Sequence, residues 1–147
     1  MSSAQFFTRS WNETRISEMA FGRGISKHLA GLADGISSVD VHINEISPNT
    51  GLGHYHVHKR ADNIYLILVG TMQVVIGQRR HVASDMTAIV IPAGTPHAAG
   101  NAGEETARVV EIYAPAGDDL HILKPPDLVV DDASGDEIEC EFRWEGE

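Results

Sequence analysis

Three histidines, His54, His56 and His58, occupy every second position in "GHYHVHKRADNIYLILVG", residues 53–70. Alternate residues of a β-strand share a face, so this spacing turns all three imidazoles to one side of a strand. Neighbouring members are roughly 6.6–6.8 Å apart along the backbone, and two of them can tilt toward one metal ion. His54 and His58 are about 13 Å apart, too far to reach a common ion. The pattern predicts a metal site that uses at most two of these histidines and needs another ligand from elsewhere.

A further histidine, His97, lies in "PAGTPHAAGN", residues 92–101, directly after the apolar run "TAIVI". Its spacing is P-x-G-x2-H-x3-N, which resembles the second motif of the cupin superfamily. The first cupin motif reads roughly G-x5-H-x-H-x3-4-E-x6-G, and residues 50–70 resemble it, with Thr50 at the first glycine. A second departure is Met86, also at a position where the family usually has glycine. The resemblance implies that His56, His58 and His97 are the metal ligands.

The glutamate of the first cupin motif falls on Asn63 in this sequence. The resemblance therefore places Asn63 beside the metal as a neutral and weaker donor than a carboxylate. Such a centre keeps more net charge and more open positions, which favours bidentate substrates such as enolates, hydroxy acids or diketones. Asp62 takes over the role of the glutamate only if a β-bulge turns it inward, because neighbouring residues of a strand face opposite ways.

Three other residues are candidates for catalysis. His54 lies farther along the same face as the proposed ligands and is a candidate for either proton transfer or substrate binding. Tyr65 shares a strand face with Asn63 and is either a pocket hydroxyl or a buried ring. Glu111 lies between Val110 and Ile112 and points either inward as a cavity acid or outward as a surface charge. The remaining histidines have no partner pattern and are expected on the surface or in packing: His28, His42, His81 and His121.

Short apolar runs separated by turn residues are typical of an all-β protein, a sandwich or small barrel. Residues 39–44 alternate apolar and polar side chains, as a half-buried strand does. The central runs are apolar on both faces, which indicates that another layer or another subunit covers them. The cupin resemblance implies a single jelly-roll-like β-barrel of the double-stranded β-helix type.

The chain divides into three parts. Residues 37–117 contain the cupin core, and residues 1–36 are an N-terminal extension that joins the barrel or a dimer contact. Residues 118–147 comprise an acidic loop and an amphipathic strand at 137–145, in which Ile138, Cys140, Phe142 and Trp144 form the apolar face. The apolar tail and the strands that are apolar on both faces leave surface for a partner, so we expect a homodimer.

The composition limits the partners and the compartment. The formal net charge is −10, from 21 acidic and 11 basic residues, which disfavours nucleic acid and anionic membranes as partners. A single cysteine forms no internal disulfide, and the sequence contains neither a signal-peptide core nor an apolar run of about 18 residues. The expected location is the cytoplasm.

The resemblance implies a metal-dependent cupin that acts on a small organic molecule, with the ion as a Lewis acid. With iron, it implies a dioxygenase that cleaves an enolisable, diketone-like substrate. With manganese, zinc or nickel, a lyase or isomerase is equally consistent with the residues. The alternative from another class is a non-catalytic module that binds or senses a small molecule.

Overall fold

The computed structural model describes residues 5–144, which form two β-sheets and two short 3-10 helices. The first sheet contains, in spatial order, β1 (Ile16–Glu18), β2 (Gly24–Ala30), β3 (Asp40–Ile46), β10 (Ala107–Ala114), β5 (Asp62–Val69) and β8 (Ala88–Ile91). The second contains β11 (Leu120–Ile122), β4 (His56–His58), β9 (His97–Asn101), β6 (Thr71–Ile76), β7 (Arg79–Ser84), β12 (Val129–Asp131) and β13 (Glu137–Ile138). The 3-10 helices are η1 (Ala20–Gly22) and η2 (Leu32–Asp34).

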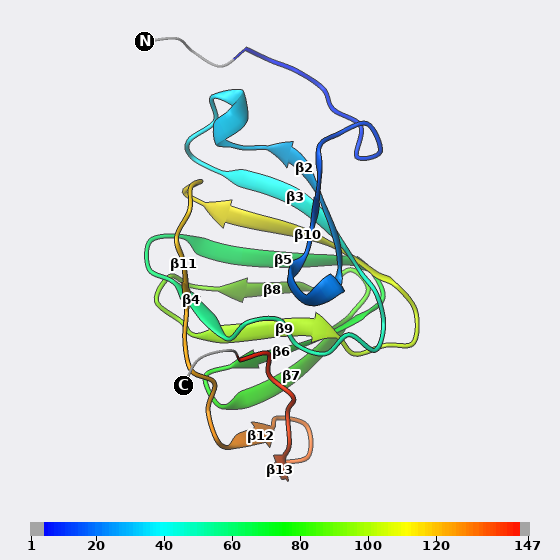
Figure 1. Cartoon of the computed structure of the whole chain (residues 1–147), viewed down its shortest axis with the longest axis vertical. Coiled ribbons are helices and arrows are strands. Elements are labelled where there is room, and N and C mark those ends of the chain that lie inside the picture. The colour runs from blue at the N-terminus through cyan, green and yellow to red at the C-terminus, as the bar shows by residue number, and fades with distance from the viewer. Residues whose placement is uncertain (1–4, 145–147) are drawn as a thin grey trace.

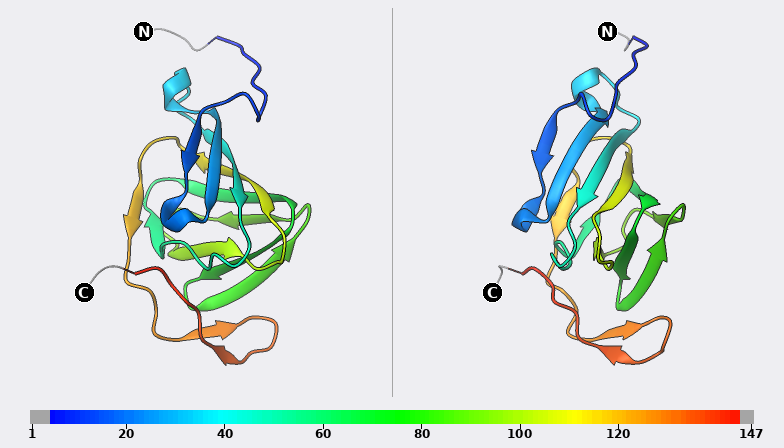
Figure 2. Two further views of the ribbon diagram at one scale, coloured as in Figure 1. Left: turned by 45° about the vertical axis from the view of Figure 1, so that its right-hand side comes forward. Right: turned by 90° about the vertical axis from the view of Figure 1, so that its right-hand side faces the viewer.

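The two sheets pack face to face, and the main hydrophobic core lies between them (Figures 1 and 2). Ile67 on β5 and Val109 on β10 come from the first sheet, and Val74 on β6 comes from the second; all three are almost completely buried. Along β5 every second side chain is buried, which is the period of a strand with one face in the core. This arrangement confirms the predicted all-β, jelly-roll-like fold.

Strand pairing brings the histidine motifs together. β4 and β9 are antiparallel neighbours in the second sheet, and His56 lies directly opposite His97. Asn63 and Tyr65 lie on β5, and Glu111 lies opposite Tyr65 on β10, both strands of the first sheet. The histidines and the other candidate residues therefore face each other across the space between the sheets.

Two turns show why glycine recurs in the motifs and where this chain departs from them. Gly70, which ends the β5 motif, has φ 105°, and a Cβ there would lie 2.9 Å from the Cα of Ala107. Met86 stands where the family usually has glycine and adopts the left-handed conformation, with φ 59°. That conformation costs a non-glycine residue about 1–2 kcal/mol. The turn before β8 adopts it nonetheless, with methionine in place of glycine.

The N-terminal segment extends the first sheet. β2 pairs with β3 from Gly24 to Ala30, and β1 pairs with the outer edge of β2. Met19, in the turn before η1, packs against the main core. In the described residues no helix has the length and hydrophobicity that a membrane span needs.

The expected amphipathic strand at 137–145 is wrong in its length. Only Glu137 and Ile138 are in strand conformation, residues 139–144 are irregular, and residue 145 lies outside the described part. The ladder stops because its partner β12 contributes only two paired residues. Ile138, Cys140 and Phe142 nevertheless pack against a second cluster on the outer face of the second sheet. This tail explains why β6 is apolar on both faces, with Val74 in the main core and Val75 beneath the tail.

Candidate metal centre

Three buried histidines converge between the sheets. One nitrogen each of His56, His58 and His97 lies within 4.8 Å of the others, and the Nε2 atoms of His56 and His58 are 3.2 Å apart. His56 and His58 share a face of β4, and strand pairing brings His97 to the same place from β9. These are the three histidines that the motif spacing selects as ligands.

The hydrogen bonds of two rings fix which nitrogen is free to bind a metal. His56 Nδ1 donates to the carbonyl oxygen of His54 at 2.8 Å, and His97 Nδ1 donates to the carbonyl oxygen of Thr95 at 2.9 Å. A carbonyl oxygen only accepts, so each Nδ1 carries the hydrogen and each Nε2 presents a lone pair. Backbone carbonyls orient the ligands of metal sites in the same way.

Burial also keeps the three rings neutral. It lowers the pKa of His56 to about 3, and the nearby His97 ring adds to the shift. The pKa values of His58 and His97 are likewise lowered, first by burial. Neutral imidazole is the form that binds a metal, so all three are ready to bind at neutral pH.

Asn63 completes the convergence. The side chain is fully buried, and its Nδ2 donates to Glu111 Oε2 and to the carbonyl oxygen of Ile112, each at 3.1 Å. These two acceptors turn the amide oxygen toward His97, with Oδ1 and Nε2 3.2 Å apart. Both facing atoms carry lone pairs and no hydrogen, an arrangement that a cation between them stabilises. Three imidazole nitrogens and one amide oxygen fit a divalent transition metal.

Asp62 does not take the place of the missing glutamate. Its side chain is on the opposite face of β5 from Asn63 and accepts a hydrogen bond from the backbone N–H of Ala93 at 2.9 Å. The hypothesis of a bulge that turns Asp62 inward is therefore wrong, because β5 is regular at this position.

Glu111 points inward, which decides between the two orientations left open by the sequence. It accepts hydrogen bonds from His42 Nε2 at 3.1 Å, Asn44 Nδ2 at 2.8 Å and Asn63 Nδ2 at 3.1 Å. Although burial disfavours its charge, these bonds and the charge of His42 hold the pKa of Glu111 well below its usual range. The Glu111 carboxylate therefore lies behind Asn63, and it is ionised.

His42 was expected on the surface or in packing, and its buried ion pair corrects that expectation. Its Nδ1 lies 2.9 Å from Asp40 Oδ1 and its Nε2 3.1 Å from Glu111 Oε1. Two carboxylate partners require hydrogens on both nitrogens, so the ring is an imidazolium. Burial opposes this charge, yet the hydrogen bonds to Asp40 and Glu111 raise the pKa of His42 to about 9.

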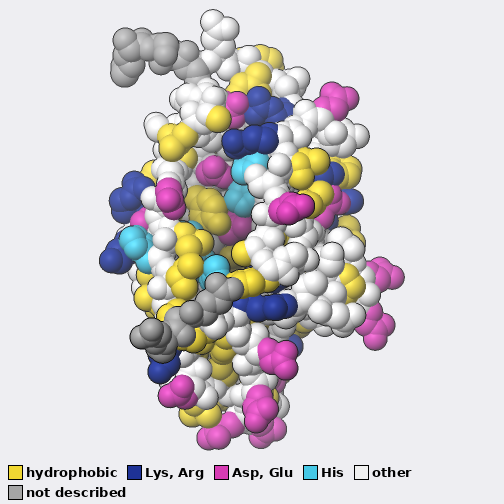
Figure 3. All heavy atoms as spheres, in the orientation of Figure 1, with side chains coloured by type: hydrophobic (Ala, Val, Ile, Leu, Met, Phe, Trp, Pro, Cys, Tyr) yellow, Lys and Arg dark blue, Asp and Glu magenta, His cyan; other side chains and the backbone are white. Residues whose placement is uncertain are grey.

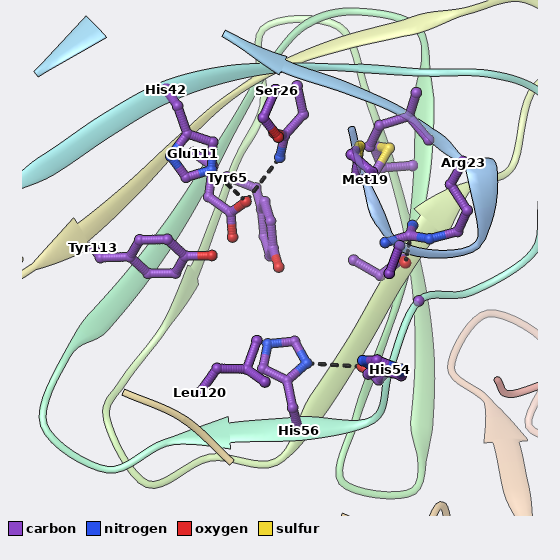
Figure 4. Close-up of a pocket in the computed structure, with 16 residues that line it drawn as sticks. Met19, Arg23, Ser26, His42, His54, His56, Tyr65, Glu111, Tyr113 and Leu120 are labelled. Atoms are coloured by element: carbon purple, nitrogen blue, oxygen red, sulfur yellow. Dashed lines mark hydrogen bonds and ion pairs between the residues drawn. The ribbon is translucent and has the colours of Figure 1, made fainter. Parts of the chain in front are cut away.

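A pocket of about 270 Å³ opens beside the cluster, and His56 is the cluster histidine that lines it. Figure 3 shows histidine, acidic and hydrophobic side chains together at the hollowed centre of this face. In the close-up, Glu111, Tyr65 and Tyr113 lie on one side, Arg23 and His54 on the other, and His56 at the floor (Figure 4). Burial raises the pKa of both tyrosines, so their hydroxyls keep their protons.

Of the residues expected to be catalytic, Tyr65 and Glu111 come from the first sheet and His54 precedes β4. The strand begins only at His56, so His54 is outside it, contrary to the spacing argument. The His54 ring still lines the pocket and meets Phe21 edge-on, with the ring centroids 4.7 Å apart. Sequence reasoning missed Arg23, His42, Asn44 and Tyr113, all of which line the pocket. The polar positions of residues 40–44 were the one available signal, since β3 turns them inward.

Two facing β-sheets with a histidine cluster between them define a jelly-roll protein with a candidate metal centre. Residues 42–113 match the family model described as the cupin domain, and the chain belongs to the cupin superfamily. No protein of curated function matches the sequence.

Solved structures share the fold. The polyketide cyclase RemF from Streptomyces resistomycificus is similar with a TM-score of 0.71 and 19% identity, over 84% of this chain and 89% of that one. KdgF from Halomonas sp. is similar with a TM-score of 0.64 and 22% identity, over 78% of this chain and 98% of that one. For the Lactobacillus farciminis oxalate decarboxylase the TM-score is 0.65 and the identity 18%, over 76% of this chain and 34% of the decarboxylase. This chain thus spans about a third of that enzyme.

Proposed function

We propose that this protein is a metal-dependent cupin enzyme that acts on a small, enolisable organic molecule. The observation that carries the proposal is the convergence of three neutral imidazoles and the Asn63 amide oxygen beside a pocket. His56, His58 and His97 would hold a divalent transition metal, iron, manganese, zinc or nickel, with Asn63 Oδ1 as a weak fourth donor. The ion, when bound, supplies Lewis acidity to a substrate oxygen.

The residues around the pocket supply the remaining requirements. Tyr65 and Tyr113 keep their hydroxyl protons and are hydrogen-bond donors for a substrate oxygen. His54 is the candidate for proton transfer, because its imidazole ring lines the pocket. Glu111 is fully committed to His42, Asn44 and Asn63, so it positions the amide of Asn63 rather than moving a proton.

The finer activity that we propose first is that of a dioxygenase on a diketone-like substrate. The donor set carries no negative charge, so a divalent ion held there would keep its full charge. Three histidines would leave room both for an enolate that binds through two oxygens and for O₂, provided that the weak Asn63 donor gives way to them. This activity requires iron and consumes oxygen.

The second candidate is a non-redox reaction, by a lyase, isomerase or cyclase. The observation in its favour is the wall of proton-carrying groups, His42, Tyr65 and Tyr113, which such reactions use and an oxygen-dependent cleavage does not require. The structural neighbours named as a polyketide cyclase and an oxalate decarboxylase support it as relatives in fold. A sensing module that only binds its ligand is the alternative outside enzymes.

One experiment separates these activities. The purified protein is analysed for metals, reloaded with iron or manganese, and assayed with acetylacetone, a small β-diketone, while dissolved oxygen is recorded. Oxygen uptake that requires iron supports the dioxygenase, whereas anaerobic conversion supports the second candidate. A protein that holds no transition metal, either as purified or after reloading, contradicts the proposed function.

A further inference from the structure

We infer that Arg23 is a substrate-binding residue that recognises a carboxylate, and that the substrate is therefore a small organic anion. This inference rests on the proposed function, because it assigns a second anchoring point to the same pocket. Arg23 lies across the pocket from Glu111, beside His54 (Figure 4). It is far from the metal motifs in sequence, and nothing in those motifs selects it.

The backbone around Arg23 holds it in place. Gly22 has φ 65° and Gly24 has φ 156°, and a Cβ at Gly24 would overlap the carbonyl of Glu45 on the neighbouring strand. The N–H of Ser47 donates to the carbonyl oxygen of Arg23 at 2.9 Å. The side chain thus leaves the start of β2 from a fixed point and crosses into the pocket.

Gly53 makes room for the guanidinium group. A Cβ at Gly53 would overlap Nη2 of Arg23 and come within 2.7 Å of its Cζ. The φ of Gly53 is not in the left-handed region, so the backbone there accepts other residues and only the arginine requires glycine. Gly53 immediately precedes His54, so this close approach brings the guanidinium to the same side of the pocket as His54 (Figure 4).

Most hydrogen-bond donors of Arg23 are unused. A guanidinium has five N–H donors. In residues 5–144 Arg23 makes one side-chain hydrogen bond, from Nη1 to the carbonyl oxygen of Ala99 at 3.3 Å, and no ion pair with a carboxylate within 4.0 Å. Its Nε is buried without any acceptor. Arg23 is half-buried, and a charge withdrawn from solvent in this way normally has a partner, so this one lacks what a bound anion would supply.

The charges of the pocket favour an anion as well. The His42 imidazolium is already engaged by two carboxylates, those of Asp40 and Glu111. Arg23 also lines the pocket, and in residues 5–144 its guanidinium has no carboxylate within 4.0 Å, so it is the cation that remains available to a ligand. Its planar, forked donors match the two oxygens of a carboxylate. A ligand that places a carboxylate at Arg23 and a chelating group at the histidines spans the pocket of about 270 Å³.

The test compares pairs of acids that differ only in one distal carboxylate. The cobalt-loaded protein is titrated with 2-oxoglutarate and with 2-oxopentanoate, and binding is followed in the visible spectrum of the metal. The longer pair, 2-oxoadipate and 2-oxohexanoate, allows for an unknown distance between the two anchoring points. The wild type is expected to bind at least one diacid about tenfold more tightly than its matched monoacid, the effect of one charge-assisted contact.

Three variants locate the preference. Arg23→Gln keeps a donor for the Ala99 carbonyl but removes the charge, and the preference is expected to fall to within about twofold. Gly53→Ala keeps the charge but displaces the fork, and it should weaken the preference in the same direction. Arg143→Gln is the matched control, because Arg143 also donates to a backbone carbonyl, that of Thr50, and does not line this pocket. It should leave the preference unchanged.

The outcomes separate this inference from the proposed function. Equal binding of diacid and monoacid by the metal-loaded wild type overturns the inference alone, as does a preference that survives in Arg23→Gln. If cobalt is held but none of the four acids changes its spectrum, the inference is overturned and the metal site stands. If the protein holds no cobalt, the proposed function fails and this inference fails with it. Thermal unfolding of each variant shows whether it is folded, and Arg23→Lys, which keeps the charge without the fork, replaces Arg23→Gln if that variant is not.

Discussion

The amide nitrogen of Asn63 donates to the carboxylate of Glu111 at 3.1 Å, and this bond turns the Asn63 oxygen toward His97. The glutamate of the first cupin motif is absent here, but a negative charge is still present. It is on Glu111 of β10, which lies behind Asn63 and not among the histidines. An amide at residue 63 is the side chain that suits this arrangement, because it donates to Glu111 on one side and presents an acceptor on the other. Asn63 and Glu111 act as one unit.

Replacement of Asn63 by glutamate tests this unit. A carboxylate is a better ligand for a divalent ion than an amide, so Asn63→Glu should tighten metal binding by at least about tenfold, or roughly 1.4 kcal/mol. Without metal the new carboxylate faces Glu111 and the Ile112 carbonyl with no donor, and the free energy of unfolding should fall by about 3 kcal/mol. Competition with a chromogenic chelator and urea unfolding with excess EDTA measure the two effects.

Asn63→Gln is the control for the extra methylene, because it keeps the amide chemistry. It should lose stability through crowding without any gain in metal affinity. If Asn63→Glu and Asn63→Gln bind metal equally, residue 63 does not face the ion.

The assignment of ligands is tested by two histidine variants. His97→Ala removes one of three imidazoles and should weaken metal binding by more than about 100-fold, since the loss of an outer-layer partner alone costs 10–100-fold. His54→Gln should leave metal binding nearly unchanged, because only the backbone carbonyl of His54 supports His56. Elemental analysis after desalting measures both. Loss of metal in His54→Gln and retention in His97→Ala would place the ligand set elsewhere.

The buried ion pair of His42 predicts a pH dependence of stability. Its pKa is raised from 6.5 to about 9, so its contribution is complete below pH 6.5 and is lost as the pH rises through 9. The free energy of unfolding should fall by about 3 kcal/mol over this range, because deprotonation removes the cation that pairs with Asp40 and Glu111. Urea unfolding of the EDTA-treated protein at several pH values measures it. His42→Gln should be less stable at pH 6.5 and should lack this decrease; an identical slope in both proteins would refute the assignment.

Sequence spacing predicted the part of the site that depends on regular strands. Residues two apart on a strand share a face, so His56 and His58 converge. The resemblance to the cupin motifs added His97 and Asn63 to the site. The argument from strand spacing failed two residues before the strand, at His54, because the chain becomes regular only at His56.

The parts that were missed depend on tertiary contacts. The polar residues of β3 look solvent-facing in sequence, but His42 and Asn44 are buried because Glu111, nearly 70 residues later, supplies their partner. β7, "RRHVAS", contains a single large apolar residue, Val82, and is a strand because β6 offers it a full antiparallel edge. Arg23 carries no motif, and its position follows from the absence of a side chain at Gly53. None of these pairings is encoded in local periodicity.

The outer face of the first sheet predicts a homodimer. Ile64 and Leu66 on β5 are only partly buried, and Val90 on the neighbouring edge strand β8 is 60% exposed, so an apolar surface remains that no element of residues 5–144 covers. A second copy of the chain would bury it.

Light scattering at micromolar concentration should give twice the chain mass of 15.9 kDa. Val90→Lys places a charge in this surface and should yield monomers, whereas Val82→Lys, at a similarly exposed valine on the second sheet, should remain dimeric. A wild-type mass near 16 kDa would exclude the dimer, and dissociation by Val82→Lys alone would move the interface to the second sheet.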